Sequence, residues 1–335
     1  MRAHAYRLRW EDRRVATTAE HYLVFAEFGA HGSSPIYEAW ARGVASDADI
    51  LSRIDELPRS KRIATLVFAS ARAAGAPLED WAVMREWMRA HWDAIREIAL
   101  THETQTNEAG RCATLLPAFG LIEGPIALLE VGTSAGLCLH PDRYSYDYVT
   151  DGGVVALDPP TGPSAVRLRC ELRNATLPAT VPEVVWRAGI DRNPLEVSNP
   201  ADRDWLETLI WPEHDERRRR LRAAAAVAAS EPTHIVTGDI NDELERLASQ
   251  APTDATLVVF HSAVLLYLDD EAKARFVETV RALDCVWVGN EAPGVLQAVD
   301  AQLVPRAMVA SRFILSVDGT PRALTGQHGE AYEGL

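Results

Sequence analysis

The chain contains few cysteines, and none of them is spaced as in a metal or redox motif. No CxxC pair occurs among the four, which are Cys112, Cys138, Cys170 and Cys285. This scatter is typical of buried thiols in a reducing compartment and argues against a disulfide framework or a zinc site. The H-x₃-H and HExxH patterns are missing as well, so the sequence predicts no metal site.

Long apolar runs are also missing. No stretch approaches the roughly 18 residues needed to cross a bilayer, and charges interrupt the opening segment MRAHAYRLRWEDRR throughout. With 47% apolar and 24% charged residues, the composition is that of a soluble globular protein. We therefore expect a cytoplasmic protein with no signal peptide and no membrane partner.

The chain has fewer basic than acidic residues. The chain has 34 Lys and Arg against 48 Asp and Glu, which gives a net charge of −14. Phosphate binding depends on clustered Lys and Arg, so this balance argues against DNA or RNA partners. One arginine-rich run, residues 217–220, is flanked by acidic residues and predicts the solvated face of a helix.

The first third of the chain has a helical pattern. Apolar residues recur at helical spacing over residues 12–115, which predicts a helical N-terminal cap region over residues 1–115. With 335 residues, the chain is long enough for a second, larger domain, which we place at residues 116–335.

From residue 125 onward the pattern changes to short apolar runs. Buried strands are predicted at residues 125–132, 183–191, 234–240, 256–262 and 284–291. Helical stretches separate the later runs, so we expect βαβ units and a parallel sheet covered on both faces. Asp318-Gly319 predicts a terminal hairpin. Residues 141–182, rich in Gly and Pro, predict a β-rich insertion after a first helix.

The segment Glu130-Val131-Gly132-Thr133-Ser134-Ala135-Gly136 follows the first predicted strand. It lacks the GKS or GKT of a phosphate-binding P-loop. An acid at the strand end, Glu130, repels a pyrophosphate but attracts a cation such as the ammonium of a methionine moiety. The glycines Gly132 and Gly136 would let a ligand approach the backbone. The alternative is a plain strand-to-helix turn with no ligand.

Acids also follow the second and third strands. In an open parallel sheet, ligands bind beyond the carboxyl ends of the strands. Asp191 would accept hydrogen bonds from both ribose hydroxyls of a nucleoside, or instead cap the turn before Pro194. Asp239 would accept a hydrogen bond from the exocyclic amine of adenine, and Ile240 would pack on the adenine ring. Alternatively, Asp239 caps the helix that follows.

Polar residues at the next two strand ends are candidate catalytic groups. His261 follows the fourth strand and Glu291 ends the fifth. A neutral imidazole accepts a proton near pH 7, so His261 is the first candidate base and Glu291 the second. A histidine after an apolar run is also common as a satisfied core residue.

A dense polar segment precedes the first strand. Within HETQTNEAGRC, residues 102–112, four side chains are candidates for a lid or for the substrate wall: Gln105, Asn107, Glu108 and Arg111. The alternative is an ordinary exposed helix start.

These segments resemble a known family over nearly the whole chain. The resemblance depends on AEFGAHGSSPIYEAWARGVA, TQTNEAGR, LLEVGTSAGLCLHPDRYSYDY, WRAGIDRNPLEV, LIWPEHDERRRRLRAA, GDINDEL, VVFHSAVLLYL and NEAPGV. The chain is similar to the bacterial DUF2332 family of uncharacterised proteins. At the level of fold and cofactor motifs, it resembles the class I S-adenosylmethionine-dependent methyltransferases.

The methyltransferase resemblance implies a Rossmann-like, doubly wound α/β fold. Its mostly parallel sheet would have seven strands and end in an antiparallel hairpin. It implies that Glu130, Gly132 and Gly136 belong to the glycine-rich motif, that Asp191 binds ribose, and that Asp239 contacts adenine. Ser134 stands where the family has its middle glycine. The (N/D)-P-P-(F/Y) motif of many amino-methylating enzymes is absent after the fourth strand.

The leading hypothesis is therefore a methyltransferase that uses S-adenosylmethionine and acts on an unidentified small molecule. Two alternatives stay open. The first is a non-catalytic ligand-sensing or protein-interaction protein on the same scaffold. The second is a nicotinamide-dependent oxidoreductase.

Overall fold

The structure is a computed structural model that describes residues 17–231, 233–303 and 312–335. Its contacts divide the chain into two compact units. The first comprises residues 1–106 and 204–218, and the second comprises residues 107–203 and 219–335. The boundary expected at residues 115–116 would cut the helix α8, Cys112–Phe119. The contacts instead assign α8 to the second unit, together with the segment that leads into it.

The described part of the first unit is helical, as the apolar spacing predicts. Phe68 is fully buried, with its ring centroid 5.1 Å from that of Tyr37 and 5.5 Å from that of Trp40. No helix among the described residues has the length and apolar character that a membrane crossing requires. The elements are α2 (Thr18–Val24), the π-helix η1 (Phe25–Ala30), α3 (Pro35–Ala45), α4 (Ala48–Asp55), η2 (Arg59–Lys61), α5 (Ala64–Ala73), α6 (Trp81–Ala90) and α7 (Trp92–Thr101).

The described residues of the second unit form one mixed, mostly parallel sheet of eleven strands, in the order β3-β2-β4-β11-β10-β9-β8-β7-β1-β5-β6. Seven strands were expected, and the excess includes the insertion, whose three strands join the same sheet. The strands are β1 (Ile126–Val131), β2 (Ser145–Thr150), β3 (Gly153–Leu157), β4 (Arg167–Arg173), β5 (Val184–Asp191), β6 (His234–Thr237), β7 (Thr256–Ser262), β8 (Val286–Glu291), β9 (Arg312–Val317), β10 (Thr320–Gly326) and β11 (Ala331–Gly334).

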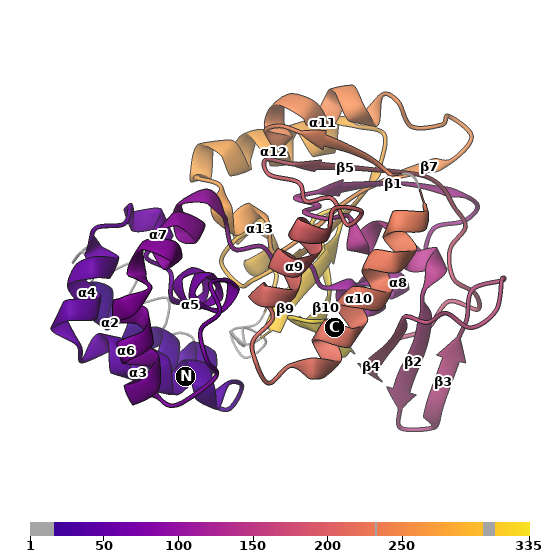
Figure 1. Cartoon of the computed structure of the whole chain (residues 1–335). Helices are drawn as coiled ribbons and strands as arrows, with labels where there is room; N and C mark the ends of the chain where they lie inside the picture. The colour runs from indigo at the N-terminus through magenta and orange to yellow at the C-terminus, as the bar shows by residue number, and fades with distance from the viewer. Residues whose placement is uncertain (1–16, 232, 304–311) are drawn as a thin grey trace. The chain divides into compact units, whose positions relative to one another are not determined.

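The centre of the sheet is parallel and covered on both faces. Strands β6, β5, β1, β7 and β8 pair in parallel, and every residue of β1 is buried. Leu129 and Val259 pack in one core with α11 (Ile240–Ala248) and α12 (Asp270–Ala282). On the other face, Phe260 meets Phe119 of α8 at 5.5 Å between ring centroids, and Figure 1 shows these helices around β1, β5 and β7. Further helices among the described residues include η3 (Ala109–Arg111), α9 (Pro200–Leu209), α10 (Asp215–Ser230), η6 (Leu265–Tyr267) and α13 (Gln297–Asp300).

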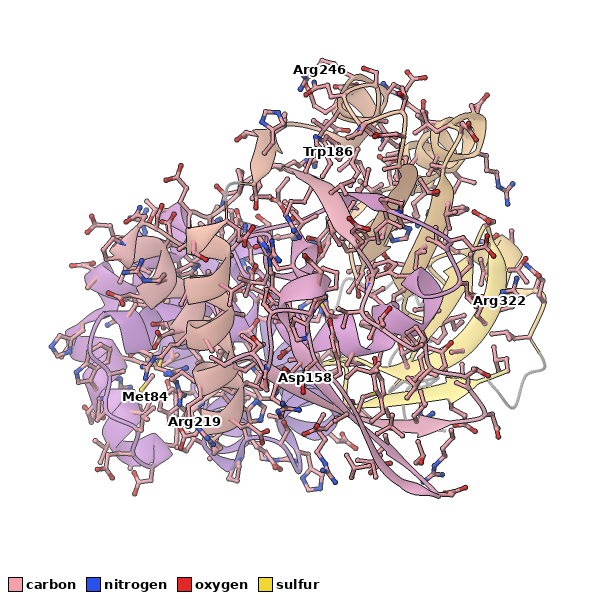
Figure 2. The ribbon with its side chains drawn as sticks, turned by 90° about the vertical axis from the view of Figure 1, so that its right-hand side faces the viewer. Met84, Asp158, Trp186, Arg219, Arg246 and Arg322 are labelled. Atoms are coloured by element: carbon pink, nitrogen blue, oxygen red, sulfur yellow. The ribbon has the colours of Figure 1, made fainter. Side chains whose placement is uncertain are left out.

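The terminal hairpin is confirmed. Strands β9 and β10 pair antiparallel around Asp318 and Gly319, which both have positive φ, 51° and 75°. Two such residues make the tight turn that matches strand twist. The insertion adds the hairpin of β2 and β3. Asp158, after β3, forms an ion pair with Arg167 of β4 at 2.8 Å, at the end of β3 away from its turn (Figure 2).

The helix expected directly after β1 is absent. Two short 3-10 turns stand there instead, η4 (Leu137–Leu139) and η5 (Pro141–Arg143). Pro141 has no N–H to donate and disfavours a helical conformation at His140. The loop after β1 therefore does not end in a helix N-terminus.

His140 should make the stability of the second unit depend on pH. The side chain is fully buried, and burial, followed by the charges of Arg187 and Arg143, lowers its pKa to about 4. The unfolded chain takes up this proton near pH 6.5 and the folded chain only near pH 4. We therefore expect stability to be full above pH 6.5 and to fall by about 3 kcal/mol as the pH drops to 4.

Urea unfolding at several pH values measures this loss. We expect His140→Gln to make the free energy of unfolding depend less steeply on pH between pH 6.5 and pH 4, the range set by the lowered pKa of His140. His234→Gln is the control, because His234 is exposed at the start of β6. An unchanged slope in His140→Gln would contradict the assignment.

Candidate functional site

The three expected acids lie at the carboxyl ends of adjacent strands. Glu130 is the penultimate residue of β1 and Asp191 the last of β5, and Asp239 follows β6 by two residues. Strand β5 lies between β1 and β6, and all three run parallel. The three acids are therefore at one edge of the sheet, where parallel α/β sheets bind ligands.

The loop after β1 is tightly wound. Gly132, Ser134 and Gly136 have positive φ values of 70°, 52° and 72°. A Cβ on Gly132 would lie 2.4 Å from the Val264 side chain, so glycine serves both the turn and the close approach of the segment after β7. Ser134 has the same backbone conformation without being glycine, which costs of order 1 kcal/mol.

Every amide of this loop donates a hydrogen bond inside the second unit. Gly132 and Thr133 donate to the Ile190 carbonyl, Ser134 to Asp191 Oδ2 at 2.7 Å, Ala135 to Asn107 Oδ1 at 2.8 Å, and Gly136 to the Thr133 carbonyl. A phosphate site needs such amides to point at the ligand. In this conformation the loop presents no free amide to a phosphate.

Glu130 is a buried carboxyl group that accepts a hydrogen bond from a side chain of the loop. It is 6% exposed, and the Thr133 hydroxyl donates to its Oε2 at 2.7 Å. Burial raises the pKa of Glu130 well above its usual range, the Cys138 thiol adds to the rise, and the Thr133 hydrogen bond and Arg111 oppose it. A ligand cation beside Glu130 would favour its charged form.

Asp191 and Asp239 are engaged in local hydrogen bonds. Asp191 accepts from the amides of Ser134 and Asn193 at 2.7 and 2.8 Å. Asp239 caps α11 by accepting from the Asn241 amide at 2.9 Å, and it also forms an ion pair with Arg192. The Arg192 hydrogen bond lowers the pKa of Asp239. The capping alternative thus describes what Asp239 does in this structure.

Ile240 is a core residue. It is 6% exposed and packs among apolar side chains that include Leu244 and Ile190. Its contacts are therefore with the sheet and with its own helix.

His261 and Glu291 form a buried hydrogen-bonded pair at the ends of β7 and β8. The Trp287 indole donates to His261 Nε2 at 3.0 Å, so His261 Nδ1 carries the proton and donates to Glu291 Oε1 at 2.7 Å. The same Oε1 accepts from the amides of Val264 and Leu265 at 2.9 and 3.1 Å. His261 is fully buried with both ring nitrogens bonded. In this arrangement it has no ring nitrogen free for a substrate proton.

The polar segment before β1 is packed within the second unit. Asn107 holds the loop through two hydrogen bonds, one of them from its Nδ2 to Ser134 Oγ at 2.5 Å. Glu108 is 4% exposed and pairs with Arg220 at 2.8 Å. Arg111 is 7% exposed. Asn107 therefore fixes the loop, and Glu108 is held by α10. Gln105 belongs to the first unit.

Several residues of this edge were not anticipated. Thr133, the hydroxyl partner of Glu130, stands in the quoted loop motif and was within reach of sequence reasoning. Trp287 was less visible, because only strand pairing brings its indole to His261. A buried chain links the Thr325 hydroxyl to Asn290 Oδ1 at 2.7 Å, and Asn290 Nδ2 to Ser262 Oγ at 3.0 Å. Ser262 and Asn290 stand beside His261 and Glu291 at the strand ends in the sequence, whereas no local signal marks Thr325.

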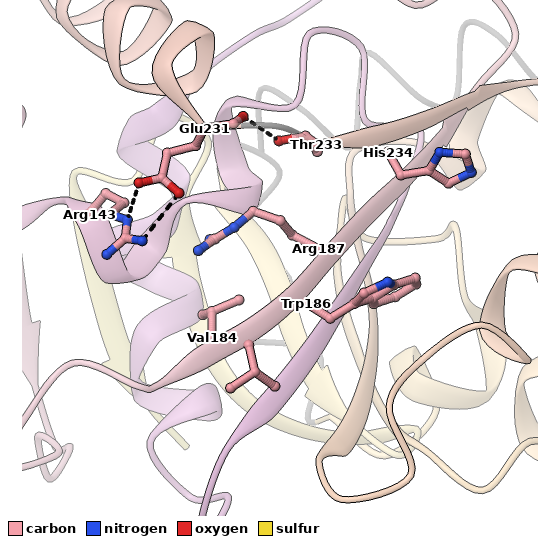
Figure 3. A pocket seen from close by; sticks show the side chains of 8 residues that line it. Arg143, Val184, Trp186, Arg187, Glu231, Thr233 and His234 are labelled. Carbon is pink, nitrogen blue, oxygen red and sulfur yellow. Dashed lines mark hydrogen bonds and ion pairs between the residues drawn. The ribbon is translucent and has the colours of Figure 1, made fainter.

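A cavity of about 580 Å³ lies at the other end of the strands. It borders the first residues of β5 and β6, Val184 and His234, and none of the expected site residues lines it (Figure 3). Arg143 and Glu231 form an ion pair there at 2.9 Å. Arg187 is paired with Asp142 at 2.8 Å. Arg143, Glu231 and Arg187 are therefore already paired.

Close packing of β5 against the loop gives a testable consequence. A Cβ on Gly189 would lie 2.5 Å from Thr133 Cγ2. We expect Gly189→Ala to displace the loop and to lower the free energy of unfolding by about 1–3 kcal/mol. Gly152→Ala is the control, because its Cβ would meet only Thr150 Oγ1 at 3.7 Å. Urea denaturation measures both variants, and equal stabilities would show that the loop is not packed this way.

Comparison with known proteins identifies a family but no activity. No curated protein matches the chain. Among the described residues, no group of three or more His, Cys, Asp or Glu side chains is placed to hold a metal ion. One family model, described as an uncharacterized protein conserved in bacteria, DUF2332, matches residues 19–333. The chain therefore belongs to the DUF2332 family.

Proposed function

We propose that this protein is a methyltransferase that binds S-adenosylmethionine and methylates a small molecule. The observation that carries the proposal is the edge formed by β1, β5 and β6. It offers three carboxyl groups, Glu130, Asp191 and Asp239, while the amides of the loop beside them are already bonded. Such an edge recognises a ligand through hydrogen-bond acceptors. S-adenosylmethionine suits it, with an ammonium, two ribose hydroxyls and an adenine amine.

The order of the parallel strands supports the proposal. Numbered along the chain, the parallel strands β1, β5, β6, β7 and β8 lie in the order 3-2-1-4-5 across the sheet, as do the first five strands of doubly wound nucleotide-binding folds. Strand β9 joins β8 antiparallel. Strands β5 and β6 are added on one side of β1 and the strands from β7 onward on the other, so the strand order reverses between β1 and β7. Ligands of such sheets bind at this switch point, next to Glu130.

The nicotinamide-dependent alternative is disfavoured by the same hydrogen bonds. A dinucleotide pyrophosphate binds to free amides at a helix N-terminus. The amides of residues 132–136 are bonded within the unit, and only a 3-10 turn follows them. Glu130 adds a carboxyl group where the pyrophosphate would lie.

Asp191 and Asp239 retain capacity for a ligand. Each carboxylate oxygen can accept two hydrogen bonds, and each oxygen of Asp191 accepts one in this structure. Asp239 is held by Arg192, whose side chain is 70% exposed. An exposed pair of this kind contributes at most about 1 kcal/mol, so a ligand can displace Arg192.

The residues at the ends of β7 and β8 suggest how the acceptor is prepared. S-adenosylmethionine, when bound, supplies a methyl group already activated by its sulfonium. The chain must then orient the acceptor and accept its proton. We propose that Glu291 accepts this proton, because its Oε2 has no hydrogen-bond partner among the described residues. His261 is a positioning residue, because its Nδ1–H fixes Glu291 Oε1.

Calorimetry of the purified protein tests the cofactor. We expect S-adenosylmethionine and S-adenosylhomocysteine to bind, and Asp239→Asn to weaken both by roughly tenfold. Asparagine caps a helix as well as aspartate does, so α11 should remain intact. The matched control is Asp242→Asn in the first turn of α11, where Asp242 pairs with Arg275.

Absence of binding at high micromolar concentration would contradict the proposal. Equal weakening in Asp239→Asn and Asp242→Asn would remove the role given to Asp239. Tight cofactor binding without methyl transfer to any small acceptor would favour the ligand-sensing alternative.

A further inference from the structure

Arg111 is a buried cation without a carboxylate partner. It is 7% exposed, and its two side-chain hydrogen bonds go to backbone carbonyls, from Nε to Gln327 at 3.0 Å and from Nη1 to Ser262 at 2.9 Å. The guanidinium also lies over the Phe313 ring at 5.6 Å. Among the described residues, Arg111 forms no ion pair with an Asp or Glu, and neither of its hydrogen bonds uses Nη2. A buried charge without a counter-charge is costly.

A carboxylate oxygen without a partner lies at the end of the neighbouring strand. Glu291 is 3% exposed. Its Oε1 accepts three hydrogen bonds, whereas Oε2 has no partner among the described residues. Buried acceptors of this kind are nearly always satisfied in proteins. This atom is therefore the natural place for a hydrogen-bond donor from outside the chain.

Tyr267 lies on the segment that both groups contact. Arg111 donates to the Ser262 carbonyl, and Glu291 accepts from the amides of Val264 and Leu265. The Tyr267 amide donates to the Val264 carbonyl, and its side chain is 73% exposed at the end of η6 just after β7. An exposed aromatic ring beside two buried polar groups of opposite charge can cover the apolar part of a small ligand.

We propose that Arg111 and Glu291 form the recognition site for a small carboxylic acid that also carries a hydroxyl or amine. The acid's carboxylate pairs with Arg111 Nη2, its hydroxyl or amine donates to Glu291 Oε2, and its apolar part packs on Tyr267. One guanidinium matches a singly charged carboxylate better than a doubly charged phosphate. This inference rests on the proposed function, since it names the substrate class of that site.

The test compares two probes that differ by one charge. Binding of 4-hydroxybenzoate and of its neutral amide, 4-hydroxybenzamide, is measured by ligand-observed NMR on the full chain without cofactor. We expect the acid to bind at least about tenfold more tightly than the amide, as for a charge-assisted hydrogen bond. Because no cofactor is present, this result is independent of whether S-adenosylmethionine binds. If the protein binds the acid but does not bind S-adenosylmethionine, the carboxylate site is supported and the methyltransferase proposal is contradicted.

Variants locate the preference within the structure. We expect Arg111→Gln to abolish the preference for the acid and Arg111→Lys to retain part of it, because lysine keeps the charge without the planar fork. Tyr267→Ala should weaken both probes equally. Glu291→Gln should weaken 4-hydroxybenzoate but not benzoate, which has no hydroxyl. Arg322→Gln is the control, because Arg322 is an exposed arginine on β10 of the same sheet (Figure 2).

Thermal unfolding checks that each variant is folded. If Arg111→Gln does not fold, the comparison of acid and amide binding in the wild type and in Arg111→Lys still tests the role of Arg111. Three results would each overturn the proposal: equal binding of acid and amide, no binding of the acid at millimolar concentration, or an undiminished preference in folded Arg111→Gln. Stronger competition by inorganic phosphate than by the acid would also overturn it.

Discussion

The hydrogen bonds that close the loop 132–136 onto its neighbours are the constraint on which the rest of the site depends. A buried amide left without an acceptor is costly, so the loop must keep the Ile190 carbonyl, Asp191 and Asn107 in place. Those partners come from β5 and from the segment before α8, which are thereby fixed to β1. The loop uses all its backbone amides on the protein itself, so the edge of the sheet is left with acceptors.

The ends of β7 and β8 follow a different principle, because here buried polar groups are left partly unsatisfied. The chain from Trp287 through His261 to Glu291 uses one carboxylate oxygen and leaves the other without a partner. Arg111 stands nearby with carbonyl partners only. Structures seldom tolerate such groups except where a ligand or a strained site accounts for them. The acceptor-rich edge and these two groups together define the proposed site.

Local patterns predicted much of the fold. The apolar run at residues 256–262 coincides with β7, and Asp318-Gly319 gave the terminal hairpin, because burial period and turn chemistry are encoded over a few residues. The path of the insertion could not be predicted. Its strand β4 joins the sheet by pairing with β11, where Glu171 lies opposite Ala331. Nothing near either residue in the sequence specifies the other, so no local pattern indicated a sheet longer than seven strands.

Sequence position is enough to place the acids at strand ends. A strand end is a local feature, so Glu130, Asp191 and Asp239 could each be assigned to a strand tip from its position alone. What each polar group does there depends on tertiary packing. Arg111 contacts Ser262 and Gln327, which are 151 and 216 residues away along the chain, and His261 meets Trp287 through strand pairing. Hydrogen bonding and burial depend on atoms brought together by packing, and these set whether a charge is paired, capped or left for a ligand.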